Sequence, residues 1–208
     1  MRFARPIRWL LASFGGARVE FEIEGVASGL HSRGHRFANP EPFEAASFDA
    51  LIEGLRARYV EPDPAERERR IREAADPVAR GGRADDDLVE ENVFLTEWPT
   101  AVKGDFPERF LELPDAVLVT AMAKHERFFP VFGRDGRLQA RFVSIRNHGD
   151  EATVRDGNAW VLVARFADAK FFYDEDRKHT LSEFLERTAG MSFQEKLGTV
   201  RQRADRLE

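Results

Sequence analysis

The stretch from Phe128 to Ile145, FFPVFGRDGRLQARFVSI, constrains the fold more than any other part of the sequence. It places Asp135-Gly136 between two apolar runs, and Asp-Gly in this setting is a strong signal for a tight turn between antiparallel strands. Segments with helical periodicity precede and follow this hairpin. Helical and strand segments intermixed in this way predict an α+β fold.

The composition limits the class of protein. The chain has 208 residues, 42% hydrophobic and 33% charged, enough for one compact domain or one domain with appendages. The absence of cysteine excludes disulfides and thiolate metal sites. The formal net charge of -5 argues against a general electrostatic coat for nucleic acids, which leaves a local basic face as the alternative. No apolar run approaches the roughly 18 residues needed to span a bilayer, so we expect a soluble, cytoplasmic protein.

The first part of the chain predicts a hairpin. An apolar run from Ile7 to Phe14 ends at Gly15-Gly16, and the following ARVEFEIEG alternates apolar residues with glutamates. Strict alternation is typical of a half-exposed strand. We therefore expect the two segments to pair across the glycines.

Capping residues and apolar periodicity predict the helices. Ser47 is placed as an N-cap, and DPAE at 63–66 has the capping-box pattern with proline at the first helical position. Asp105 and Glu108 repeat the capping-box pattern. The stretch 75–87, ADPVARGGRADDD, is the one expected flexible connection. We expect helices over 47–59, from 63 to before Pro77, 85–96, 105–113 and 115–127, and a helical chain from about 154 to the end with breaks near 178 and 190.

The sequence contains no recognisable catalytic or metal-binding motif. It lacks G-x-S-x-G, the phosphate-cradling G-x-x-x-x-G-K-[ST], and G-x-G-x-x-G before a helix. His31 and His35 lie four residues apart, but Gly34 between them argues against a helical metal pair, so we expect His35 to pack or hydrogen-bond. His125 lies near a helix end that favours a cation, which indicates a structural role. The carboxylates at 174–176 are typical of a solvated face rather than a metal or paired-carboxylate site.

Two opposite charges interrupt the apolar segment VLVARFADAKFFY at 161–173. Arg165 and Asp168 fall about 60° apart on a helical wheel, with apolar neighbours between them. An isolated buried charge would cost several kcal/mol, so a mutually satisfied pair is the best interpretation. We predict a structural Arg165–Asp168 ion pair that fixes how the helix docks.

Six strings in order carry a resemblance to a known family. They are FARPIRWLLASFGG, SGLHSRGHRF, TEWPTAVKGDFPERFLELP, KHERFFPVF, GNAWVLVARFADAKFFYDED and FQEKLGT. Together they resemble the β subunit of bacterial heterotetrameric glycyl-tRNA synthetase, from about Arg2 to Thr199 and most weakly over 38–88. That subunit is much longer, so the chain resembles its central portion. The chain end, SFQEKLGTVRQRADRLE, has helical composition without capping signals, so we expect the chain to be part of a longer protein. The resemblance implies that the missing parts are an N-terminal part and downstream His-Asp-type and anticodon-binding domains.

The resemblance implies a fold and a reaction. At fold level it implies an editing-type domain like that of the phenylalanyl-tRNA synthetase β subunit, an α+β fold of antiparallel sheets with packed helices. We expect that domain over residues 1–150, with a charged helical insertion at about 61–84, and a helical segment over 151–208 leading to a further domain. The implied enzyme is an α2β2 glycine–tRNA ligase that uses ATP and Mg to join glycine to tRNA(Gly), releasing AMP and diphosphate. Its α subunit carries the class II catalytic core, so we expect no cofactor and no catalytic residue in this chain.

The matching polar residues are candidates for contact with tRNA. They are Arg33, His35 and Arg36 in RGHRF, Lys124, His125 and Arg127 in KHERF, and Arg146 and Asn147 in SIRN. Arginine and lysine suit phosphates, and Phe37 or Phe128 could stack on an unpaired base. The structural alternative is that these residues join loops to the core.

Two other roles stay open. One is an editing-type hydrolytic domain that clears mischarged tRNA, with Thr96, Glu97 or His125 orienting a water. The other is a purely structural scaffold, in which altering the basic residues leaves tRNA affinity unchanged. Shared fold alone does not transfer editing activity.

Overall fold

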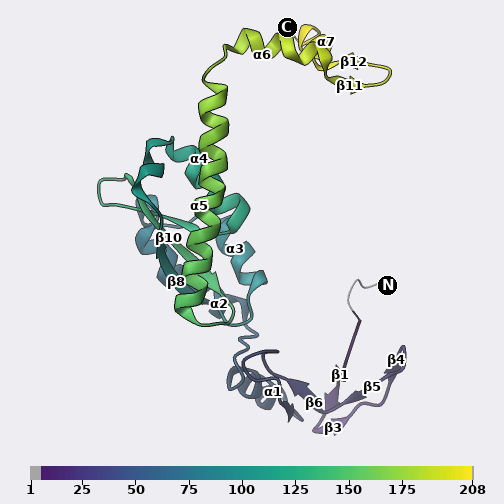
Figure 1. Ribbon diagram of the computed structural model, residues 1–208. Helices are drawn as coiled ribbons and strands as arrows, with labels where there is room; N and C mark the ends of the chain where they lie inside the picture. Colours follow the sequence, from purple (N-terminus) through teal and green to yellow (C-terminus); the bar gives the residue numbers. More distant parts are fainter. Residues whose placement is uncertain (1–5, 208) are drawn as a thin grey trace.

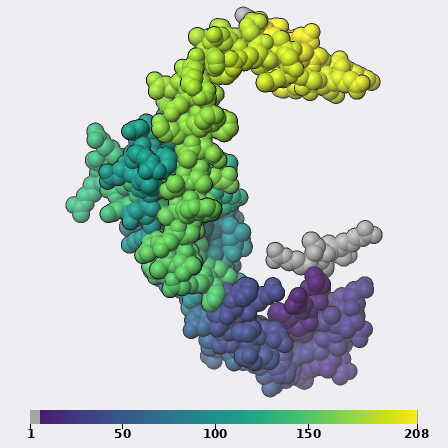
Figure 2. Space-filling view, viewed as in Figure 1, coloured from purple at the N-terminus to yellow at the C-terminus, as the bar shows by residue number. Residues whose placement is uncertain are grey.

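The protein is an open arc in this computed structural model, which describes residues 6–207 (Figure 1). A small N-terminal unit, residues 6–60, forms one end of the arc. A central body of helices and strands follows, and the long helix α5 (Glu151–Asp176) runs along it. Beyond α5, residues 177–207 form a C-terminal module at the other end. Figure 2 shows the two ends of the arc facing each other across open space.

The central body is built on one antiparallel sheet. Its strand order is β8 (Thr100–Asp105), β10 (Leu138–Arg146) and β9 (Phe129–Phe132). The predicted hairpin is confirmed: Leu138 pairs with Phe132, and Gly136 in the turn has a φ of 73°. Strand β8 was not among the predicted elements.

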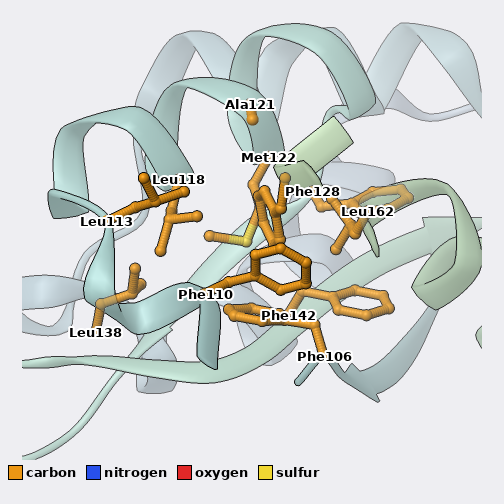
Figure 3. Packing of buried hydrophobic residues seen from close by; sticks show 11 residues of the cluster. Phe106, Phe110, Leu113, Leu118, Ala121, Met122, Phe128, Leu138, Phe142 and Leu162 are labelled. Carbon is orange, nitrogen blue, oxygen red and sulfur yellow. The ribbon is translucent and has the colours of Figure 1, made fainter. Parts of the chain in front are cut away.

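Helices cover both faces of this sheet, because adjacent residues of β10 point to opposite sides. Phe142 is fully buried against the turn η3 (Glu108–Glu112), α4 (Asp115–Thr120), the π-helical turn η4 (Ala121–Glu126) and α5 (Figure 3). Val143 is fully buried on the other face, against α2 (Pro64–Ala75) and α3 (Asp86–Leu95). These two apolar clusters give the body a helix–sheet–helix arrangement.

Two predicted N-caps are confirmed: the side chains of Ser47 and Asp63 each accept a backbone N–H in the first turn of α1 (Phe48–Arg56) and α2. The predicted helix start at 85–87 is also confirmed, and the Asp85 side chain accepts a backbone N–H in the first turn of α3. The predicted cap at Asp105 was wrong. Asp105 lies in β8, where Arg141 Nε donates to it across the sheet at 3.2 Å, and the following turn has no side-chain cap.

The charged segment 61–84, expected as a helical insertion, contributes residues to the core. Ile71 and Ala75 on α2 are fully buried in the cluster around Val143. The connection after α2 contains two short 3-10 turns, Asp76–Val78 and Arg80–Gly82. A helix that is charged overall can still supply the one apolar stripe that a core needs.

The N-terminal unit consists of short strands and α1. It contains a sheet of β1 (Leu10–Leu11), β5 (Val26–Gly29) and β4 (Glu22–Ile23), and the hairpins β2 (Ser13–Phe14) with β3 (Ala17–Arg18) and β6 (His31–Arg33) with β7 (Pro42–Glu44). The hairpin across Gly15-Gly16 is confirmed. Strands β1 and β5 run parallel, although the resemblance implied antiparallel sheets. The segment ARVEFEIEG, expected as one half-exposed strand, is divided between β3 and β4, and its apolar side chains are exposed as well as its glutamates.

The C-terminal module is only partly helical. Helix α6 (Leu181–Arg187) and α7 (Val200–Asp205) begin with capping boxes at Thr180 and Thr199. Between them lies an antiparallel pair, β11 (Ser192–Gln194) and β12 (Gly198–Thr199), where the sequence predicted helix. Within residues 6–207 no helix is both long and apolar enough to cross a bilayer.

Candidate functional site

Two of the three basic motifs meet in one groove, where the N-terminal unit joins the central body. This junction groove has a volume of about 400 Å³. It is lined by Phe37, Ala38, Tyr59, Trp98, Thr100, Arg146, Asn147, His148 and Gly149. The lining therefore combines the RGHRF and SIRN motifs with residues that sequence reasoning did not select.

Aromatic rings form much of the groove wall. Phe37 is 71% exposed, and its ring lies nearly parallel to that of His148, at 16° with centroids 6.2 Å apart. Tyr59 and Trp98 meet edge-on at 5.8 Å. The guanidinium of Arg70 lies over Trp98, 4.3 Å from the ring centroid. Aromatic rings and guanidinium planes offer faces on which a planar ring can stack.

His35 shapes the loop beneath this wall. Its Nδ1 accepts the backbone N–H groups of Phe37 and Ala38 at 3.3 and 3.2 Å, which confirms the expected hydrogen-bonding role. The residue is only 2% exposed, and its ring centroid lies 5.3 Å from that of His148. Its Nε2 is buried without a hydrogen-bond partner. His35 therefore holds the backbone of the loop that carries Phe37 and Ala38, and its own side chain presents little surface.

The other two motif residues at the groove, Arg146 and Asn147, are held by contacts with neighbouring residues. Asn147 Oδ1 accepts the backbone N–H groups of Glu97 and Trp98 at 2.7 and 2.9 Å, so it positions the Trp98 wall. Arg146 donates to the carbonyl of Gly149 and lies 3.6 Å from the Glu151 carboxylate. Its Nε is buried and has no partner.

The arginines of the RGHRF loop remain exposed next to the groove. Arg33 donates to the Pro40 carbonyl at 3.3 Å, which closes the loop between β6 and β7. Arg36 stands over the Phe37 ring, 5.6 Å from its centroid. Both guanidinium groups keep donors free for another acceptor because Arg carries five N–H groups.

The KHERF motif lies elsewhere and serves mainly to end a helix. Arg127 has a left-handed backbone (φ 58°), and its side chain donates to the carbonyls of Lys124 and His125 and pairs with Glu91 at 3.1 Å. Such contacts satisfy carbonyls left unpaired at a helix end. Phe128 is buried and stacks on the core residue Phe142, so the expectation that it could stack on a base is wrong. Lys124 and His125 are exposed.

A second, apolar pocket of about 280 Å³ lies beside Lys124. Its lining includes Leu88, Val119, Phe129 and Phe132, with charged groups at the edge. Arg80 at this edge is already paired with Asp115 at 2.9 Å and lies over Phe132. The pocket therefore does not unite the basic motifs.

The predicted Arg165–Asp168 pair is not the one that forms. Arg165 Nε donates to Glu126 Oε1 at 2.9 Å, and Asp168 is exposed on α5. The physical reason is that both residues lie on the rim of α5, where Arg165 reaches the half-buried carboxylate at the end of η4. The pair that does form joins α5 to η4, so docking of this helix still involves Arg165.

Sequence reasoning missed a buried carboxylate at the joint between the units. Glu61 is 1% exposed and binds Arg56 at 3.0 Å and Arg70 at 3.1 Å. Its own N–H donates to the carbonyl of Glu97. The available signal was weak: arginines five and nine residues away flank a glutamate just before the Asp63 cap.

The residues considered for editing chemistry do not converge. Thr96 is buried, and its hydroxyl donates to the Asn92 carbonyl at 2.9 Å. Thr96, Glu97 and His125 line neither the junction groove nor the apolar pocket. Across residues 6–207, no three His, Asp or Glu side chains form a metal-binding group.

Comparison with known proteins identifies the family. A family model described as the glycyl-tRNA synthetase beta subunit matches residues 1–208, the whole chain. The chain belongs to the glycyl-tRNA synthetase beta subunit family.

Several curated beta subunits of glycine–tRNA ligase are similar to this family member. That of Syntrophomonas wolfei is 43% identical over 213 residues, that of Listeria monocytogenes 41% over 217, and that of Clostridioides difficile 40% over 215. Each alignment covers 100% of this chain and 31% of the relative. The chain thus spans about a third of the length of the glycyl-tRNA synthetase beta subunits that it matches.

Proposed function

We propose that this chain is the tRNA-docking and scaffolding portion of the β subunit of glycine–tRNA ligase. The enzyme joins glycine to tRNA(Gly) with ATP and Mg, releasing AMP and diphosphate, and it does so in an α2β2 assembly in the cytoplasm. In this proposal the α subunit binds ATP and Mg and performs the chemistry. The observation that carries the proposal is the family match over the full chain.

The junction groove is the surface we assign to docking. Arg146 lines the groove, and Arg33 and Arg36 belong to the RGHRF loop, whose Phe37 also lines it. Arginine binds phosphate oxygens well, and such contacts position RNA without reading its sequence.

The proposal also covers the fold of the chain and two alternative functions, hydrolytic editing and a structural scaffold. We propose that the fold is related to the editing-type domain of the phenylalanyl-tRNA synthetase β subunit. Hydrolytic editing is the weaker functional candidate, because its three candidate residues line no common pocket. A purely structural scaffold is the remaining candidate.

Charge reversal in the assembled synthetase tests the docking role. Arg33→Glu and Arg36→Glu are each expected to weaken tRNA(Gly) binding, and to reduce the slope of log affinity against log salt by about one per lost phosphate contact. Arg137→Glu is the matched control, since Arg137 is exposed beside the turn at the opposite end of β10 from Arg146. Unchanged affinity and slope in both variants, with an intact fold, would favour the scaffold.

A further inference from the structure

We infer that the junction groove binds one unpaired RNA nucleotide, with its base on the Phe37 and His148 rings and its oxygen acceptors toward Arg146. This inference rests on the proposed function and deepens it. It assigns single-stranded RNA, rather than duplex RNA, to the groove.

The rings offer a stacking surface in an unusual position. Phe37 is a fully apolar side chain that stays largely in water, although it lies at the edge of a groove. Its near-parallel partner His148 and the Tyr59–Trp98 pair give the groove four aromatic groups. Unpaired bases stack on aromatic side chains and on guanidinium planes, and Arg36 supplies such a plane over Phe37. A duplex hides its base faces and could not use this surface.

Two buried donors near the rings have no acceptor. Because Nδ1 of His35 accepts two backbone N–H groups, its ring proton lies on Nε2, and that Nε2 is unpartnered. Arg146 Nε is likewise buried and unpartnered, and Arg146 lines the groove. Buried N–H groups without an acceptor are rare in folded proteins and require an explanation. His35 does not line the groove, so its donor is closed to a ligand there. Arg146 does line the groove, and its guanidinium can meet the phosphate, ribose or base acceptors of a nucleotide.

The walls are held in place without a ligand. Asn147 fixes the backbone at Trp98 with two hydrogen bonds. Tyr59 adopts a left-handed backbone (φ 59°), which is costly for a bulky residue and is found preferentially at functional sites. The groove volume of about 400 Å³ suits one small ligand. A preformed groove lowers the entropy cost of binding.

Trp98 provides a direct reporter of occupancy. The chain has three tryptophans, so Trp9→Phe with Trp160→Phe leaves Trp98 as the only one. This 208-residue variant is titrated with a short single-stranded oligoadenylate, the same strand annealed into a duplex, and inorganic phosphate. We expect the single strand to quench Trp98 fluorescence, and the duplex and phosphate to have little effect. Phe37→Leu should weaken single-strand binding roughly tenfold, since stacking on one aromatic ring is lost.

Phe172→Leu is the matched control, because Phe172 is also an exposed aromatic residue but lies on α5. Circular dichroism of each variant establishes that the fold is intact. No quenching by the single strand, or equal affinity in Phe37→Leu, overturns the inference and leaves ordered water as the partner of the two donors. Quenching by phosphate alone overturns it in favour of a simple anion site.

The outcomes separate this inference from the proposed function. If the groove fails these tests while Arg36→Glu still weakens tRNA binding by the synthetase, docking stands and the nucleotide site is rejected. If the single strand binds at Trp98 while Arg33→Glu and Arg36→Glu leave synthetase–tRNA affinity unchanged, the nucleotide site stands and the docking role is rejected.

Discussion

Arg56 and Glu61 form the tightest ionic contact at the joint between the N-terminal unit and the central body. Arg56 Nε lies 3.1 and 3.0 Å from the two oxygens of Glu61, and its Nη2 lies 3.0 Å from Oε1. Arg70 on α2 adds a contact of 3.1 Å to the second oxygen. One buried carboxylate thus ties the end of α1 to α2, next to the residues that line the junction groove.

Replacing this carboxylate should destabilise the protein. Glu61→Gln keeps the shape but removes the charge that two guanidinium groups share, so we expect the free energy of unfolding to fall by about 2 kcal/mol. Urea denaturation measures it. Glu73→Gln is the control: Glu73 is exposed on α2, the helix that carries Arg70, and pairs with Arg69, and such surface pairs contribute little. Equal effects of the two changes would show that burial of Glu61 is unimportant.

Two glycine substitutions should have opposite effects. A Cβ at Gly104 in β8 would lie 2.3 Å from the ring of Phe142, which has no room to move in the core (Figure 3). Gly104→Ala should therefore cost about 2 kcal/mol of stability by overpacking. A Cβ at Gly157 on α5 meets nothing within 4 Å, and Gly157→Ala should add up to about 1 kcal/mol through helix propensity. Thermal or urea unfolding of both variants gives the comparison, and a shift of the same sign in each would contradict it.

Acid should weaken the charged face of α2. Hydrogen bonds from Arg69 and Arg70 lower the pKa of Glu66 from an ordinary 4.5 to about 2. A carboxylate whose folded pKa is depressed adds stability above its unfolded pKa and loses that contribution as pH falls toward its folded pKa. Glu66→Gln should therefore reduce the fall in melting temperature between about pH 5 and pH 2. Glu90→Gln, at an exposed position on α3, should keep the wild-type slope.

A double-mutant cycle tests which partner Arg165 uses. Arg165→Gln combined with Glu126→Gln should reveal a coupling of about 0.5 kcal/mol, the size expected for a partly exposed pair. Arg165→Gln combined with Asp168→Asn should show no coupling. The reverse result would restore the pairing that the helical wheel predicted.

Local signals in the sequence predicted local structure well. The turn at Asp135-Gly136, the caps at Ser47 and Asp63 and the helix start at Asp85 depend on residues within one turn of each other, so the sequence contains the whole signal. Strand β8 has no such signal. It is specified by pairing with β10, where Gly104 opposes Phe142, and that partner is distant in the chain. Propensity alone could not identify it.

The candidate site was predictable only in part. The family resemblance selected Arg146 and the RGHRF loop, but it could not show that these meet in one groove or that KHERF lies apart from them. Tyr59 and Trp98 join the groove through the fold around Glu61, which no local pattern indicates. The wheel set Arg165 and Asp168 among apolar neighbours as a pair, but the carboxylate that Arg165 binds comes from another element.

Helix α5 connects the central body to the C-terminal module. Its 26 residues extend about 39 Å, and its fully buried contacts, Leu162 and Phe166, lie near its middle. Trp160, on the opposite side from Leu162, is 74% exposed. A tilt of about 10° around Phe166 would carry Asp176, roughly 15 Å further along, by about 3 Å, and it would have to move Tyr173, which packs against the same apolar cluster. The direction of α5 therefore sets the distance between the two ends of the arc (Figure 1).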